Sequence, residues 1–172
     1  MPDDLRLILY PDPRLKKKSQ PVTVFDEDLK KTAARMFELM REHEGVGLAA
    51  PQVGLNIRLF VVNATGKPED DKVYVNPMMS DADGDEESEE GCLSLPDIKV
   101  AIRRPTVRVK MQAQDLEGKP FEEIGEGFLT RIWQHENDHL NGVLITDRMG
   151  PVAKMTYRKK LKEMEDDFNE GK

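Results

Sequence analysis

The chain has 172 residues, 38% of them hydrophobic and 34% charged, which favours one domain over residues 1–172 with room for a buried core. Its net charge of −7 and pI of about 5.1 argue against general binding to nucleic acids or to anionic membranes. No apolar run approaches the ~20 residues that cross a bilayer, and the first residues do not resemble a secretory signal, so we expect a cytoplasmic protein.

Hydrophobic periodicity predicts a chain of mixed helices and strands. We expect a helix over 26–43, then strands over 57–62 and 73–75, of which the second ends at Asn76-Pro77. A solvated acidic loop over 81–90 and a strand over 107–113 follow, and the chain returns in a partner strand over 120–124. The last two elements are a helix that begins at 128 and stops before Gly142, and a helix over 151–168. Asp26 and Pro151 suit the starts of their helices. A calcium loop is the alternative for 81–90, but the EF-hand positions of glycine and glutamate do not fit. In the last helix we expect one packed face, formed by Tyr157, Leu161, Met164 and Phe168.

The most informative motif lies in the second expected helix, where His135 and His139 are four residues apart. Residues at this spacing share one helix face, so both imidazoles can bind one cation. Glu136 follows the first histidine, close enough to handle protons. This is the HExxH pattern of zinc-type hydrolases, and the competing interpretation is a polar surface helix. Phe128 and Ile132 share the histidine face, so the histidines continue a buried stripe rather than pointing to water.

A catalytic metal site needs a third protein ligand and one open position. Cys92, the only cysteine, is the most suitable candidate, although His43 and many carboxylates are also available. Gly91 lets the backbone approach closely, and Pro96 makes the following segment rigid. The alternative for a lone cysteine is a small buried hydrophobe. As a ligand, the thiol would be kept ionised by the cation at neutral pH.

A third segment, residues 45–54, is rich in glycine and alanine, so a substrate backbone could lie close against it. Gln52 within it can donate an amide hydrogen bond. A phosphate-binding loop does not fit, because no Gly-Lys-Ser/Thr follows and the glycine spacing of dinucleotide-binding loops is absent. Taken alone, such a segment is more often tight packing than a binding site.

Together, three motifs resemble those of peptide deformylases: Gly45-Val46-Gly47-Leu48-Ala49-Ala50-Pro51-Gln52, Glu90-Gly91-Cys92-Leu93-Ser94 and Gln134-His135-Glu136-Asn137-Asp138-His139. They occur in the family's order and at similar separations. The resemblance extends to the opening Leu9-Tyr10-Pro11-Asp12-Pro13-Arg14-Leu15 and the turn Asp115-Leu116-Glu117-Gly118-Lys119-Pro120. It implies an α+β fold in which antiparallel strands surround a central helix carrying HExxH, with an N-terminal helix and a C-terminal helix at about 151–168.

The resemblance also implies a hydrolase of protein biosynthesis. It would remove the N-terminal formyl group from formyl-methionine of nascent polypeptides, at the ribosome, and release formate. Water bound to the metal would be the nucleophile, and Glu136 the general acid and base. Gln52 and the backbone N–H of Leu93 would face the formyl oxygen. The implied metal ligands are Cys92, His135 and His139, and the implied substrate-binding residues are Val46, Gly47, Gly91, Phe128 and Ile132.

The implied metal is Fe²⁺, and Zn²⁺, Ni²⁺ or Co²⁺ could bind the same ligands, so availability would decide among them. Two residues depart from the usual family pattern. Ser88 replaces an aliphatic residue, which would make one pocket wall more polar, and Lys99 replaces an arginine, which exchanges a planar fork for a point charge. These two departures leave the pocket preference and the peptide grip open, whereas the metal chemistry is expected to be intact.

Two other functions fit part of the pattern. A general HExxH peptidase normally takes its third ligand from a downstream carboxylate or histidine, and no histidine follows His139. Assays with formylated, acetylated and unblocked peptides would separate the two enzymes. A non-catalytic metal-binding or ribosome-associated protein could also retain the fold, and the Glu136→Gln variant would distinguish it from an enzyme.

Overall fold

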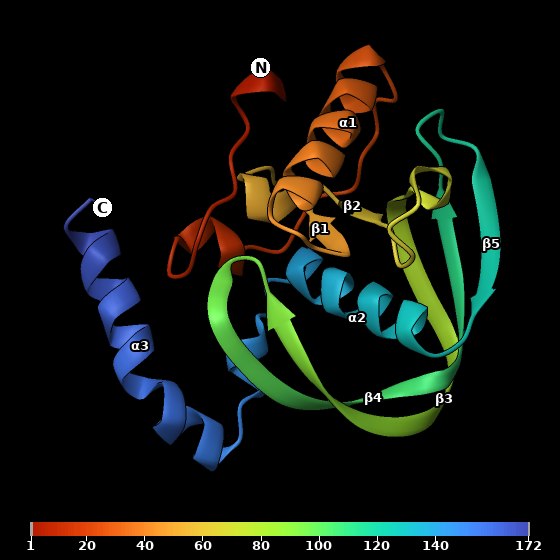
Figure 1. The fold of residues 1–172 in the computed structure, drawn as a ribbon. Coiled ribbons are helices and arrows are strands. Elements are labelled where there is room, and N and C mark those ends of the chain that lie inside the picture. Colours follow the sequence, from red (N-terminus) through yellow and green to blue (C-terminus); the bar gives the residue numbers. More distant parts are fainter. Residues whose placement is uncertain (1, 172) are drawn as a thin grey trace.

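The computed structural model describes residues 2–171 and has an α+β fold, as predicted (Figure 1). Its longer elements are α1 (Glu27–Glu42), β1 (Gly47–Ala49), β2 (Leu59–Val62), β3 (Lys72–Cys92), β4 (Leu95–Gln114), β5 (Pro120–Gly125), α2 (Phe128–Leu140) and α3 (Pro151–Asn169). Short 3₁₀ helices occur at Pro2–Asp4, Pro13–Lys16, Ala50–Val53, Pro68–Asp70 and Ile145–Arg148. The strands form one antiparallel sheet in the order β1-β2-β3-β4-β5, and the long β3–β4 hairpin bends around α2. Among the described residues, no helix combines the length and apolar character that a bilayer-spanning segment requires.

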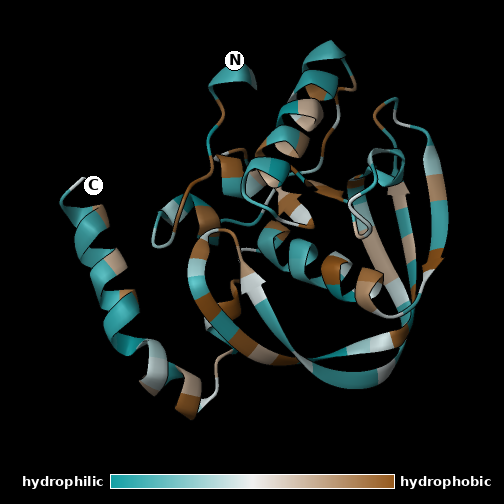
Figure 2. Cartoon of the chain, in the orientation of Figure 1, coloured by the Kyte–Doolittle hydropathy of each residue, from teal (hydrophilic) through white to brown (hydrophobic). Residues whose placement is uncertain are grey.

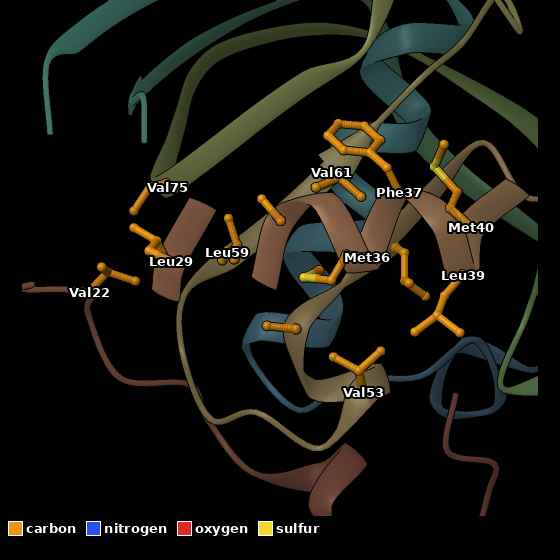
Figure 3. Close-up of a cluster of buried hydrophobic side chains, with 13 residues drawn as sticks. Val22, Leu29, Met36, Phe37, Leu39, Met40, Val53, Leu59, Val61 and Val75 are labelled. Atoms are coloured by element: carbon orange, nitrogen blue, oxygen red, sulfur yellow. The ribbon is translucent and has the colours of Figure 1, made fainter. Parts of the chain in front are cut away.

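Helix α1 confirms the first predicted helix and shows how local sequence sets it. Asp26 is the N-cap, and its side chain accepts a hydrogen bond from the backbone N–H of Leu29 at 3.0 Å. The apolar face of α1 packs on β2 and on the 3₁₀ helix at Ala50–Val53 (Figure 3). The predicted strands over 57–62 and 120–124 are likewise present, as β2 and β5. This first buried cluster holds the glycine-rich segment next to the sheet.

A second buried cluster fixes α2 on the concave face of the sheet. Trp133 is fully buried and packs edge-on against Tyr74 of β3, with ring centroids 5.8 Å apart. Tyr74 in turn contacts Phe60 of β2 and Phe121 of β5. Burying a large aromatic side chain stabilises a fold by about 2–3 kcal/mol. The rotation of α2, and with it the direction of its other face, is therefore set by Trp133.

Residues 81–90 belong to β3, so their prediction as a solvated loop was wrong. Most of their side chains are exposed, as expected, but the backbone pairs with β4. The register places Asp83 opposite Arg108 and Glu87 opposite Arg103. Opposite charges directly across two strands stabilise pairing, and this offsets the low strand propensity of aspartate and glutamate.

Both strands of the hairpin are longer than their apolar patterns predicted. β3 does not end at Asn76-Pro77 but continues through a register shift between Val75 and Met78. Proline is tolerated at such a bulge because no ladder hydrogen bond is required of its nitrogen. β4 begins at Leu95 rather than near Val107. The hairpin therefore extends far beyond the other strands of the sheet.

Helix α3 confirms the predicted C-terminal helix, although one residue of its expected packed face is misplaced. Tyr157, Leu161 and Met164 pack against a third buried cluster beneath the end of the β3–β4 hairpin. Phe168 is 43% exposed, so its assignment to this face was wrong. The last turns of α3 lie at the edge of the molecule, beyond the packed segment (Figure 1). Most of the α3 surface is hydrophilic (Figure 2).

Candidate metal centre

The two histidines lie side by side on α2, which crosses the centre of the curved sheet (Figure 1). Their ring centroids are 5.1 Å apart, with an interplanar angle of 71°. His139 is buried and His135 is half-buried. Because Trp133 faces the sheet, the histidine face of the helix is directed toward the end of β3.

Cys92, the last residue of β3, meets the histidines there. Its Sγ is 3.4 Å from His139 Nε2, and one ligand atom from each of Cys92, His135 and His139 lies within 4.8 Å of the others. One thiolate and two imidazoles at these separations suit a four-coordinate cation with one open position. The donor set therefore fits the divalent metal that the sequence motifs imply.

Glu90 lies two residues before Cys92 and orients His135. Glu90 Oε1 is 3.0 Å from His135 Nδ1. With the proton on Nδ1, the lone pair of Nε2 is left for a metal, as in many carboxylate–histidine–metal arrangements. Sequence reasoning assigned no role to Glu90. Strand alternation could have found it, since residues two apart on a strand point to the same side.

Two buried arginines neutralise Glu90. Arg104 on β4 donates from Nε and Nη2 at 2.6 and 2.8 Å, and Arg131 on α2 donates from Nη1 at 2.7 Å. Burial alone would raise the pKa of Glu90, but the hydrogen bonds from Arg104 and His135 outweigh it and hold the pKa at about 2. Arg104 also pairs with Asp138 of α2 at 3.1 Å. This ionised network ties both hairpin strands to the histidine helix.

The two histidines differ in their affinity for protons when no metal is bound. Burial lowers the pKa of His139 well below its ordinary value, so this ring is neutral and ready to bind a metal. Burial would lower the pKa of His135 as well, but contacts with Cys92 and Glu90 outweigh it and raise the pKa. The extra proton on His135 must leave when a metal binds, so metal affinity should rise with pH.

Glu136 lines the same site as a buried carboxylate. Its side chain is 4% exposed, and its Oε1 has no hydrogen-bond partner within residues 2–171. Burial is the main cause that raises its pKa to about 7. A carboxyl group with a pKa near neutrality can both accept and deliver a proton, which is what amide hydrolysis requires.

The predicted oxyanion donors, Gln52 and Leu93, both border the site. Gln52 Oε1 accepts a hydrogen bond from the backbone N–H of Ala49 at 2.9 Å, which fixes the orientation of the amide. Gln52 Nε2 is thereby directed toward Ser94 Oγ at 3.2 Å and Cys92 Sγ at 3.6 Å. An amide N–H is thus held beside the candidate metal ligand Cys92.

A pocket of about 800 Å³ opens beside these groups. All the predicted substrate-binding residues line it: Val46, Gly47, Gly91, Phe128 and Ile132. Val46 and Phe128 are 39% and 58% exposed, so their apolar side chains are available to a ligand. The lining as a whole is mixed, because charged residues such as Glu89, Asp97 and Lys99 also border the pocket.

The two residues that depart from the usual motifs lie in different places. Lys99 lines the pocket, and a Cβ built on Gly91 would come within 2.5 Å of Lys99 Nζ. Ser88 is exposed and is not among the pocket-lining residues, because the pocket reaches β3 only from Glu89 onward. The more polar wall expected from Ser88 is therefore not observed.

Comparison with known proteins points to one family. A family model described as polypeptide deformylase matches residues 5–155. The chain is 47% identical over 160 residues to a peptide deformylase of Thermotoga maritima, covering 92% of this chain and 95% of that one. A crystal structure of peptide deformylase from Plasmodium falciparum has a TM-score of 0.91 at 39% identity and covers 95% of this chain and 97% of its own. A crystal structure of a peptide deformylase from Legionella pneumophila has a TM-score of 0.88 at 41% identity, and the match covers 94% of this chain and 95% of that one.

Proposed function

The chain belongs to the peptide deformylase family, whose members remove N-formyl groups from nascent polypeptides, and on that premise we propose a metal-dependent hydrolysis of formyl-methionine that releases formate. One observation carries the proposal. A thiol and two imidazoles converge within 4.8 Å, next to a buried carboxylate whose Oε1 has no partner among the described residues. We place this chemistry in a single catalytic domain over residues 1–172.

Cys92, His135 and His139 would hold one divalent metal. We propose Fe²⁺, with Zn²⁺, Ni²⁺ or Co²⁺ as substitutes, because thiolate and imidazole ligands suit all four. When bound, the metal would lower the pKa of water toward ~7 and polarise the formyl oxygen. Glu90 supports this site by fixing the ring of His135 through the 3.0 Å contact at Nδ1.

Glu136 is the proposed general acid and base. As water attacks the formyl carbon, the Glu136 carboxylate takes a proton from the water. The same proton is then delivered to the amine nitrogen as the C–N bond breaks, which leaves formate and a free amino terminus. The 4% exposure of Glu136 and its pKa of about 7 support both halves of this transfer.

Gln52 Nε2 and the backbone N–H of Leu93 are the proposed donors to the oxyanion that forms on the formyl oxygen. Their support is their place at the edge of the pocket and the anchoring of Gln52 by Ala49 N–H. Such donors are effective because they are oriented before the charge develops. Loss of one typically raises the barrier by about 3 kcal/mol.

The apolar part of the pocket would bind the methionine side chain, with Val46, Phe128 and Ile132 as its walls. The backbone at Gly47 and Gly91 lets the peptide lie close, because no side chain intervenes. Formyl is the smallest acyl group. A narrow site would therefore admit it and exclude acetyl, whose methyl group would clash.

The test is an assay with three otherwise identical methionyl peptides: formylated, acetylated and unblocked. We expect formate from the first and no reaction with the other two. Cleavage of an internal peptide bond would contradict the proposal and favour a general peptidase. We further propose that the substrate is met at the ribosome in the cytoplasm, where formylated chains first emerge.

A further inference from the structure

The turn that carries Cys92 is followed by a bulge in β4. Cys92 pairs with Leu95, whereas the preceding residue of β3, Gly91, pairs with Lys99. A single step along β3 thus corresponds to four steps along β4, and residues 96–98 have no register partner on β3. Cross-strand pairing therefore constrains only the two ends of this bulge, at Leu95 and Lys99, and other contacts must support the residues between them.

The bulge forms one wall of the proposed substrate pocket. Pro96, Asp97 and Lys99 line the pocket, while Ile98 between them is buried at 1% exposure in the cluster beneath the hairpin. Asp97 has φ +65°, a left-handed conformation that turns the chain sharply at this point. A shift of the bulge would therefore move a pocket wall directly.

Helix α3 lies outside the β3–β4 hairpin (Figure 1), and side chains of α3 contact the bulge. The backbone N–H of Lys99 donates to the hydroxyl of Tyr157 at 3.2 Å. Lys160 Nζ lies 3.7 Å from Asp97 Oδ2. The ring of Tyr157 also packs against the same buried cluster as Ile98. Two polar contacts thus join α3 to Asp97 and Lys99 of the wall, and Tyr157 packs on the cluster that contains Ile98.

Tyr157 and Lys160 lie beyond residue 155, where the match to the family model ends. We infer that α3 supports the pocket wall and that Tyr157 is a positioning residue. Its hydroxyl holds the Lys99 backbone in the position that a bound formylated peptide requires. The inference rests on the proposed substrate pocket. It concerns peptide binding rather than bond cleavage, because Tyr157 is not among the residues that line the pocket.

The test variant is Tyr157→Phe, which retains the packed ring and removes only the hydroxyl. We expect KM for a formyl-methionyl peptide to rise about two- to fivefold, as loss of one exposed hydrogen bond allows, with kcat unchanged. In the zinc-loaded protein without substrate, the amide hydrogen of Lys99 should exchange faster with solvent, whereas the amides of α2 should not change.

Tyr10→Phe is the matched control. Tyr10 packs against the same cluster, and the nearby Glu165 carboxylate of α3 contributes to the raised pKa of its hydroxyl. Within residues 2–171, Tyr10 makes no hydrogen bond to residues 96–99. We expect unchanged KM and unchanged Lys99 exchange in this variant. An equal rise in KM for both variants would show general loosening of α3 and overturn the inference.

Two further outcomes separate this inference from the proposed function. Faster Lys99 exchange with an unchanged KM in Tyr157→Phe would show that the contact exists but does not position substrate, which overturns the inference alone. Absence of formate release from the metal-loaded wild-type protein would refute the proposed function instead.

Discussion

The backbone of Gly47 lies directly against the Glu136 carboxylate, so that a Cβ built on Gly47 would come within 2.5 Å of Glu136 Oε2. The same Cβ would lie 3.0 Å from Ile132 Cγ2. Real Cβ atoms do not approach other atoms at 2.5 Å, and the neighbouring Ile132 leaves little room to yield. The absence of a side chain at Gly47 therefore leaves the space that the Glu136 carboxylate occupies.

We expect Gly47→Ala to displace the Glu136 carboxylate and reduce kcat about a hundredfold, because a 1 Å misplacement of a catalytic group has an effect of this order. Metal content should stay at the wild-type level. Gly150→Ala is the control, since no atom lies within 4 Å of its Cβ position. Steady-state kinetics on a formyl-methionyl peptide measures the effect, and a wild-type kcat in Gly47→Ala would refute the close contact.

Replacement of the proposed acid and base should separate chemistry from metal binding. Glu136→Gln preserves the side-chain volume but cannot transfer a proton. We expect kcat to fall by a factor of about 10²–10⁴, with one metal still bound per chain. Formate release and elemental analysis on the same sample provide the measurement. Undiminished turnover would rule out proton transfer by Glu136.

Loss of the Glu90 charge should weaken both the fold and the metal site. Glu90→Gln would leave the buried Arg131 without its carboxylate partner and Arg104 with Asp138 alone, and breaking such a buried pair typically costs about 3–5 kcal/mol. Metal affinity should fall about 10–100-fold, because His135 loses its charged partner. Urea unfolding and competition with a chelator measure the two effects.

Glu89→Gln is the control for that experiment, since Glu89 is the exposed neighbour of Glu90 on the same strand. We expect its stability to stay within about 0.5 kcal/mol of the wild type. Equal losses in the two variants would show that the charge of the strand, rather than the buried network, is responsible.

The contribution of Asp12 to stability should depend on pH. The hydrogen bond from Arg14 lowers the pKa of Asp12 below its ordinary value of 3.8, and the Asp12 carboxylate also accepts from Arg14 N at 3.0 Å. A lowered folded-state pKa means that the stabilisation is present above pH 3.8 and is lost as the pH falls through the folded value. In metal-free protein, Asp12→Asn should therefore cost about 1 kcal/mol at neutral pH and progressively less in acid. A difference from wild type that stays constant into strong acid would argue against this role.

Helix positions and the convergence of Cys92, His135 and His139 could be predicted because their signals are local. The apolar spacing around Asp26 and the four-residue separation of His135 and His139 each lie within a single element. Cys92 could be identified as the third candidate ligand because the residues next to it in the sequence, such as Gly91 and Pro96, form a recognisable motif. The structure brings these three side chains together as the motifs indicated.

The long hairpin and the buried ion network could not be predicted, because their stabilisation comes from residues distant in sequence. Strand pairing of the acidic segment depends on partners such as Arg103 opposite Glu87. Glu90 resembles its exposed acidic neighbours in the sequence, and only the fold reveals its contacts with Arg104 and Arg131. Local composition describes solvent exposure well, but it does not report cross-strand partners.

Formate release measured against bound metal is the most direct test of the proposed centre. Protein stripped by a chelator should be inactive, and one equivalent of Fe²⁺ per chain, added without oxygen, should restore turnover. Cys92→Ala should need more metal for the same activity, because one of its three ligands is lost. We predict activity proportional to the metal held by Cys92, His135 and His139, and full activity in protein without detectable metal would contradict the account.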